Sequence, residues 1–271
     1  MTTLEHLIFK NNPNLQGSIP SEVGLLTELK QLGLYNNSLN GQIPDELYAL
    51  SNLSFLNLGQ NVLHGTLSPL VEHLTSLHTL VLDDNKFLGP IVPLKLRKTK
   101  IKSLSLSGNK FSGKLAAAMK FLHDVEYMYL DKNDFSGAIP EELGELTNLN
   151  SLALDGNRFR GTVPSQLGKL TNLRFLAMGG NQLTGNLPSE MENFTNLLTL
   201  DIANNNFSGS IPQAIGMMTS LQHLYMHEND FMGFFPQFFK KLPNLGKQRD
   251  KCNEQEFNCL SVHSVTQNRC L

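Results

Sequence analysis

The chain alternates between two hydrophobic patterns, and the pair of patterns recurs every 24 residues. In one repeat, Leu152 and Leu154 are separated by a single residue, which predicts a short β-strand whose leucines point inward. Leu167, Leu170 and Leu173 then follow at intervals of three, as one face of a short helix or 3₁₀ turn requires. Each repeat therefore predicts one strand followed by one helical turn.

Two polar residue types keep the same 24-residue step. The glycines are Gly17, Gly41, Gly65, Gly89, Gly113, Gly137, Gly161, Gly185, Gly209 and Gly233, and the asparagines are Asn37, Asn61, Asn85, Asn109, Asn133, Asn157, Asn181, Asn205 and Asn229. An asparagine amide both donates and accepts hydrogen bonds, so we expect this series to satisfy buried backbone groups at the strand ends. Glycine permits a backbone conformation that a side chain would resist. Pro164 suits the first turn of the helical piece.

One coil of this kind cannot bury its own apolar side, whereas stacked coils can. The repeat carries a Gly-x-Ile-Pro segment at residues 17–20, 41–44, 137–140 and 209–212. On these motifs, the chain up to about Leu245 resembles the plant-type leucine-rich repeat. It is similar to the ectodomains of receptor-like kinases and receptor-like proteins, and to the inhibitors of polygalacturonases.

The resemblance implies an α/β solenoid: a right-handed leucine-rich-repeat superhelix of about ten repeats. A parallel sheet is expected on its concave face, and short helices, 3₁₀ turns and loops on its convex face. Residues 1–245 form the solenoid in this interpretation, and residues 246–271 form a C-terminal capping tail. The tail holds all the cysteines, which are Cys252, Cys259 and Cys270. A pair of cysteines after the last repeat resembles the cap of secreted members, which implies a Cys252–Cys259 disulfide with Cys270 left over.

Repeat four departs from the pattern, because Lys95 and Lys98 stand where leucines are expected. Val92, Leu94 and Leu96 alternate instead, so we expect an extended segment with Leu94 and Leu96 inside. The segment also carries a run of basic residues, which are Lys95, Arg97, Lys98, Lys100 and Lys102. They form either a solvated charge run or a contact site for an acidic partner.

The last repeat is rich in phenylalanine, and Phe235 and Phe239 occupy core positions that are aliphatic in other repeats. We expect these rings to seal the open end of the stack. At the other end, the first strand, Leu4 to Phe9, begins almost at Met1, without the cysteine-containing cap that the family usually carries. This departure favours a fragment, a truncated gene product or a cytosolic form of the family.

Composition and motifs argue for a binding protein that is not an enzyme. The net charge of -2 and the charged fraction of 17% are unlike those of nucleic-acid-binding proteins. The sequence shows no catalytic motif, and neither a metal nor a cofactor is expected; His223 and His227 would need further ligands to hold zinc. The N-terminus lacks the pattern of a signal peptide, and no apolar run reaches the roughly 18 residues of a membrane span.

The register of the strands places rings and carboxylates together on the concave face. The expected ligand-binding residues are Tyr127, Tyr129, Asp131, Asp155, Phe175, Asp201 and Tyr225. Exposed aromatic residues beside polar groups are typical of binding hot spots. Ala153, Ala177 and Gly179 are expected to leave a hollow between the rings, and the acidic bias indicates a ligand with basic groups. Tyrosine is also a good strand residue, and Asp commonly follows the strand in this repeat type, so a structural role for both stays open.

The resemblance implies recognition of a protein or peptide on the concave surface, with a co-receptor as a further partner, in cell-surface signalling or defence. Two alternatives stay open at this point: a stand-alone inhibitor or adaptor of the polygalacturonase-inhibitor type, and an intracellular scaffold. An extracellular or cell-surface location follows from the resemblance alone. Because the chain shows neither a signal peptide nor a membrane span, a cytoplasmic location also stays open.

Overall fold

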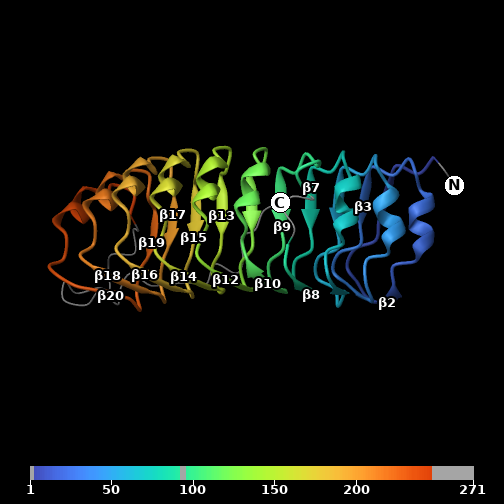
Figure 1. The fold of residues 1–271 in the computed structure, drawn as a ribbon, viewed down its shortest axis with the longest axis horizontal. Helices are drawn as coiled ribbons and strands as arrows, with labels where there is room; N and C mark the ends of the chain where they lie inside the picture. Colours follow the sequence, from blue (N-terminus) through green and yellow to red (C-terminus); the bar gives the residue numbers. More distant parts are fainter. Residues whose placement is uncertain (1–2, 92–95, 246–271) are drawn as a thin grey trace.

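The protein is a stack of coils that lie side by side along one axis, from the first coil at the N-terminal end to the last at the opposite end (Figure 1). The computed structural model describes residues 3–91 and 96–245. The strand pairings in this part of the chain are parallel, because each coil repeats the path of the one before it. The predicted right-handed leucine-rich-repeat solenoid is confirmed.

Ten short strands, one from each coil, form the sheet that we call the concave sheet. Neighbouring coils pair in register, as in Leu152 with Leu176, so equivalent residues form straight columns across the sheet. The middle residue of each strand points inward, and Leu152 and Leu176 have no exposed surface. The strands are β1 (His6–Ile8), β3 (Gln31–Gly33), β5 (Phe55–Asn57), β7 (Thr79–Val81), β9 (Ser103–Ser105), β11 (Tyr127–Tyr129), β13 (Ser151–Ala153), β15 (Phe175–Ala177), β17 (Thr199–Asp201) and β19 (His223–Tyr225).

A second parallel sheet, which the sequence pattern did not predict, lies along another side of the coils. It forms because the segment before each repeat glycine is extended, and the glycine itself takes a positive φ, such as 82° at Gly161. Its strands are β6 (His64–Gly65), β8 (Lys86–Gly89), β10 (Lys110–Lys114), β12 (Asp134–Gly137), β14 (Arg158–Gly161), β16 (Gln182–Gly185), β18 (Asn206–Gly209) and β20 (Asp230–Phe231). In the first two coils, β2 (Asn12–Ser18) pairs with β4 (Asn37–Asn40).

The helical turns are short 3₁₀ helices, as expected. Leu167, Leu170 and Leu173 are fully buried in their coil. Pro164 lies just before the helix as its N-cap, rather than in its first turn, and its carbonyl oxygen accepts a hydrogen bond from Leu167 N at 3.1 Å. The helices are η1 (Ser21–Leu25), η2 (Asp45–Ala49), η3 (Pro69–His73), η4 (Ala117–Phe121), η5 (Glu141–Glu145), η6 (Ser165–Lys169), η7 (Ser189–Asn193), η8 (Gln213–Met217) and η9 (Gln237–Lys241).

The asparagine series works as predicted. The Nδ2 group of buried Asn157 donates to Leu130 O at 2.9 Å and to Leu154 O at 3.1 Å, and its Oδ1 accepts from Phe135 N at 3.0 Å. The same three bonds recur one coil later at Asn181. A single side chain therefore satisfies backbone groups of two coils where the concave strand ends, and spares each the cost of a buried unpaired polar group.

A stack of phenylalanine rings fills the core beneath the second sheet. Phe87, Phe111, Phe135 and Phe159 are fully buried, and their ring centroids are 6.1, 6.3 and 6.4 Å apart in chain order. We call these four residues the Phe stack. Each ring follows its repeat asparagine by two residues, a step that is visible in the sequence. Leucine takes the equivalent position at Leu63 and Leu183.

The two irregular repeats agree only in part with expectation. Leu96 is fully buried as predicted, but its backbone is helical rather than extended, and Thr99 N donates to its carbonyl oxygen at 3.0 Å. Val92, Leu94 and Lys95 lie outside the described residues.

In the last coil Phe239 is buried, whereas Phe235 keeps 39% of its surface exposed, so only one of the two rings is fully in the core. The cysteines of the tail, and the expected Cys252–Cys259 disulfide, lie outside the described residues.

Candidate functional site

The concave sheet brings the predicted site residues onto one surface, in the columns expected from the strand register. Tyr127 pairs with Ser151, which pairs with Phe175. In the next column, Tyr129 leads through Ala153, Ala177 and Asp201 to Tyr225. The backbone ladder continues beyond the strands, since Lys132 N donates to Asp155 O and Gly156 N donates to Gly179 O, both at 2.8 Å. Asp131, Asp155 and Gly179 therefore form a third column beside the second.

Small residues form the floor of this surface between Tyr129 and Tyr225. Ala153 and Ala177 are each 3% exposed, Ala203 has the same value, and Gly179 is buried. Their near-complete burial shows that neighbouring side chains cover these small residues; a Cβ at Gly179, for example, would lie 2.8 Å from Asp201 Oδ1. The hollow expected from the sequence at this place stays a prediction.

Two half-buried carboxylates, Asp155 and Asp201, lie over this floor. Asp201 Oδ1 accepts a hydrogen bond from Ala203 N at 3.0 Å. Burial raises the pKa of Asp201, and this hydrogen bond and the nearby His227 partly offset that rise. Burial also raises the pKa of Asp155 to about 6, with further contributions from the carboxylates of Asp131 and Asp201. Both groups are thus ionised at a cost near neutral pH, because each loses water and Asp155 also faces other negative charges.

Asp131 lies in the predicted place but does not present its carboxylate to solvent. The residue is only 1% exposed, and Ser107 Oγ donates to its Oδ1 at 2.5 Å. Ser107 N in turn donates to Asp83 Oδ1 at 2.9 Å, and Ser105 Oγ donates to the same oxygen at 2.6 Å. Asp131 is therefore part of a hydrogen-bonded network across neighbouring coils. We assign it an electrostatic effect on Asp155 rather than direct contact with a ligand.

The aromatic residues of the site differ in exposure. Tyr127 is 39% exposed, whereas Tyr129, Phe175 and Tyr225 are half-buried. Burial raises the pKa of Tyr225, and the neighbouring Asp201 carboxylate raises it further. The rings thus offer apolar faces on both sides of the small-residue floor, and the tyrosines add a hydroxyl for hydrogen bonding.

The basic segment of repeat four is partly neutralised by acidic residues of adjacent coils. Lys98 Nζ lies 3.4 Å from Glu72 Oε2, and Lys102 Nζ lies 3.0 Å from Glu126 Oε1. Arg97 and Lys100 are exposed. Two of the cations thus have partners within the chain, which favours a solvated charge run; a contact site for an acidic partner stays a prediction.

Within residues 3–91 and 96–245, no three His, Cys, Asp or Glu side chains are placed to hold a metal ion. His227 Nδ1 is buried and has no hydrogen-bond partner in this part of the chain. Over the same residues, the helices are too short or too polar to span a bilayer.

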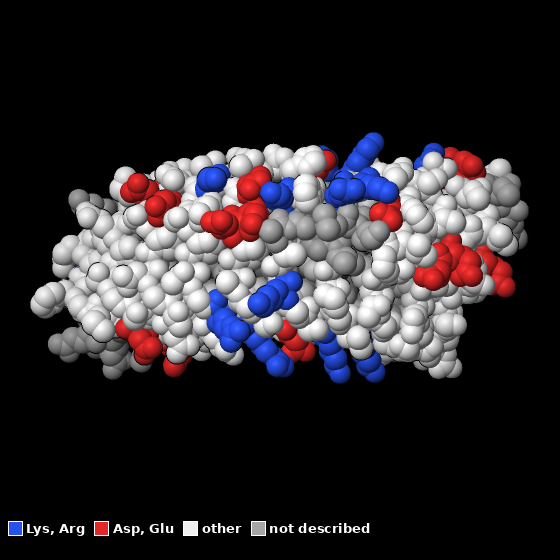
Figure 2. All heavy atoms as spheres, viewed as in Figure 1, with Lys and Arg blue, Asp and Glu red and all other residues white. Residues whose placement is uncertain are grey.

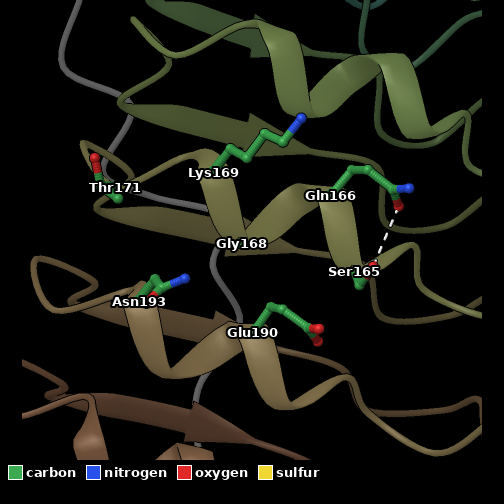
Figure 3. Close-up of a pocket in the computed structure, with 7 residues that line it drawn as sticks. All are labelled: Ser165, Gln166, Gly168, Lys169, Thr171, Glu190 and Asn193. Atoms are coloured by element: carbon green, nitrogen blue, oxygen red, sulfur yellow. Dashed lines mark hydrogen bonds between the residues drawn. The ribbon is translucent and has the colours of Figure 1, made fainter.

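A hollow also lies on the helical side, between η6 and η7 (Figure 3). Gly168 and Glu190 both line it, and the two coils approach closely there, since a Cβ at Gly168 would come within 2.5 Å of Glu190 O. Figure 3 shows Lys169 extending away from Glu190, and Ser165 Oγ donating to Gln166 Oε1 at 3.4 Å. The polar side chains that line this hollow do not point toward one common position, so the concave surface is the stronger candidate for a binding site.

Solved structures similar to this chain include two peptide-hormone receptors and one protein of another function. The plant peptide hormone receptor RGFR1 in complex with RGF2 has a TM-score of 0.67 and 29% identity, over 90% of this chain and 46% of that chain. The Arabidopsis receptor kinase HAESA, in complex with the peptide hormone IDA and the co-receptor SERK1, has a TM-score of 0.73 and 31% identity, over 90% of this chain and 45% of that chain. A plant ice-binding protein has a TM-score of 0.74 and 27% identity, over 85% of this chain and 74% of that chain.

The chain thus spans less than half of the length of these two receptor chains. No curated protein matches it. The Leucine Rich Repeat family profile matches residues 28–50, 100–122, 148–170, 172–194, 196–218 and 220–242. These six segments repeat the pattern of inward leucines, strand and helical turn described above. The chain belongs to the leucine-rich-repeat family.

Proposed function

We propose that the chain binds a peptide, or an extended segment of a protein, that carries a lysine or arginine along its concave sheet. Asp155 and Asp201 receive the cationic group, and the rings of Tyr127, Tyr129, Phe175 and Tyr225 contact the rest of the ligand. The observation that carries this proposal is the pair of half-buried carboxylates over a floor of small residues.

The electrostatics of the site favour a cationic ligand. Asp155 has the carboxylates of Asp131 and Asp201 as neighbours, and Lys132 is the cation among the described residues that lowers its pKa. A ligand ammonium or guanidinium would offset this repulsion and form charge-assisted hydrogen bonds, each worth about 1.5–3 kcal/mol. Neutral or acidic ligands would leave both carboxylates uncompensated. The site therefore selects ligands by charge at the two carboxylates and by apolar contact at the rings.

The comparisons support a peptide ligand, because RGFR1 and HAESA are both described in complex with peptides. By the same likeness we propose an extracellular or cell-surface location, and a co-receptor as a second partner. A stand-alone inhibitor that binds a folded enzyme would use the same concave sheet. Such a complex would bury about 800 Å² on each partner, as stable protein interfaces do.

A random-peptide display library selected against the full chain tests the charge preference. We expect the enriched peptides to contain Lys or Arg, and to lose most of their affinity for the variant Asp155→Asn/Asp201→Asn. The variant Asp124→Asn/Asp230→Asn removes two exposed carboxylates elsewhere and makes the same change in net charge. Enriched peptides without basic residues, or equal loss of binding in both variants, would refute the proposal.

The rings are tested by replacing Tyr127, Tyr129 and Phe175 together with alanine. Interface hot spots cost about 2 kcal/mol or more each on truncation, so binding of the selected peptides should fall at least thirtyfold. The side chains point away from the core, and we expect an unchanged circular dichroism spectrum. A folded triple variant that binds as tightly as the parent chain would remove these residues from the site.

A further inference from the structure

A second surface with the opposite charge lies on the outer side of the second sheet. Figure 2 shows Lys and Arg side chains gathered along the lower part of the molecule, where Figure 1 places β8, β10, β12 and β14. Along these strands Phe111, Phe135 and Phe159 point into the core, so their immediate neighbours point outward. The outward cations, which we call the basic face, are Lys86, Lys110, Lys114, Arg158 and Arg160. On the same four strands, Asp134 is the outward carboxylate.

The strand register brings part of this charge together in one row. Lys114 on β10 pairs with Ser136 on β12, and Ser136 pairs with Arg158 on β14. The Lys114 side chain leans over the next coil, since a Cβ at Gly137 would come within 2.9 Å of its Cγ. Two cations therefore flank a hydroxyl group on three neighbouring strands, which lie about 4.8 Å apart.

Most of these cations are not neutralised within the chain. Arg158 Nη2 lies 2.5 Å from Asp134 Oδ1, but Lys86, Lys110, Lys114 and Arg160 form no ion pair with any residue that the structure describes. All five cationic side chains are exposed. The chain as a whole has a net charge of -2, so this face concentrates positive charge on an otherwise slightly acidic protein.

We propose that the basic face binds a linear acidic polysaccharide. The outward positions of the four strands carry cations, serine hydroxyls and the Asp134 carboxylate but no aromatic ring, and Leu88 is the exposed apolar side chain among them. Nucleic-acid single strands bind by stacking bases on rings, and protein partners bind through large apolar or aromatic anchors. A glycan with carboxylate or sulfate groups along its length needs neither, because it can pair its charges with Lys and Arg and its hydroxyls with Ser112 and Ser136.

The test uses the full chain and three labelled glycans: polygalacturonate, dextran sulfate and neutral dextran. We expect one or both charged glycans to bind at low salt, with an affinity that falls steeply as salt rises, and neutral dextran not to bind. Comparing the carboxylated with the sulfated glycan shows which anionic group the face prefers. The variant Lys114→Gln/Arg158→Gln should bind on the order of tenfold more weakly, since it loses two solvent-exposed ion pairs, each weaker than a charge-assisted contact at a half-buried site.

The control variant Lys120→Gln/Lys169→Gln makes the same change in net charge on η4 and η6, and should keep the parent affinity. Equal weakening in both variants, or no binding of either charged glycan at low salt, would overturn the proposal. Binding of poly-L-glutamate as tight as that of the glycans would also overturn it, because the face would then respond to charge on any chain. Peptide binding on the concave sheet should be unchanged in Lys114→Gln/Arg158→Gln, so the two proposals can fail separately.

Discussion

The carboxylate of Asp201 lies over Gly179 of the preceding coil. A Cβ at Gly179 would come within 2.8 Å of Asp201 Oδ1 and within 3.1 Å of Ala203 O. The glycine therefore lets the Asp201 side chain reach back toward the coil that carries Asp155, and the Asp201 charge contributes to the raised pKa of Asp155. The missing side chain at one position thus brings two carboxylates of different coils within electrostatic reach.

Replacing Gly179 with alanine should displace the Asp201 carboxylate and weaken binding of Lys- or Arg-containing peptides, on the order of tenfold if one charge-assisted contact is lost. Calorimetric titration with a peptide selected on the parent chain measures the effect. Gly33→Ala is the matched control on the same sheet, because its Cβ would meet nothing closer than 3.4 Å. Unchanged affinity in Gly179→Ala would show that the position of Asp201 is not important for binding.

Asp155 should destabilise the fold near neutral pH. Its pKa is about 6 in the folded chain against 3.8 for an ordinary aspartate, so the folded state holds the proton more tightly than the unfolded state. The free energy of unfolding should therefore fall as pH rises from about 4 to 6 and stay lower above that range, by at most about 2–3 kcal/mol from this group.

Asp155→Asn removes the buried charge and should raise the free energy of unfolding above about pH 6, up to this limit, because the cost of ionisation is absent. Urea denaturation across this pH range is the measurement, with the exposed Asp124→Asn as control. A variant that is less stable than the parent at neutral pH would contradict the electrostatic assignment.

The same ionisation predicts that peptide binding depends on pH. Below about pH 6, Asp155 is protonated and cannot pair with a ligand cation, so affinity for a basic peptide without histidine should rise as pH rises through 6. Lys132 faces Asp155 as a cation, and Asp131 and Asp201 face it as anions. The rise should be smaller or absent in Asp155→Asn. An affinity that does not change with pH in the parent chain would exclude Asp155 from the binding site.

Substitutions in the Phe stack are expected to change the stability of the fold. Phe135→Ala should lower the free energy of unfolding by about 3–5 kcal/mol, because it leaves a cavity between Phe111 and Phe159. Phe135→Leu should cost much less, about 1.5 kcal/mol or below, since leucine fills the equivalent position at Leu63 and Leu183. Both are measured by chemical denaturation. Equal losses would show that contact between the rings, rather than filled volume, stabilises this layer.

The sequence by itself determined the coil and its stacking. The 24-residue step of inward leucines, buried asparagines and glycines specified parallel strands in register, so the columns that contain Tyr127, Phe175 and Asp201 could be written down in advance. The reason is that the side chains of one coil have nearly the same neighbours in every other coil, and a local pattern therefore repeats as a global one. The Phe stack follows the same step, but neither it nor the second sheet above it was predicted.

Only the tertiary structure decided what each surface position does. Asp131 and Asp155 occupy the same column and look equivalent in the sequence. Asp131, however, is buried and accepts a hydrogen bond from Ser107, whereas Asp155 is half-buried and has a raised pKa. Likewise, the Lys114 side chain can lean over the next coil because that coil has a glycine, Gly137, at the point of contact. Burial and charge depend on which side chains stand in the adjacent coils, 24 residues away along the chain, and a pattern within one repeat contains no information about them.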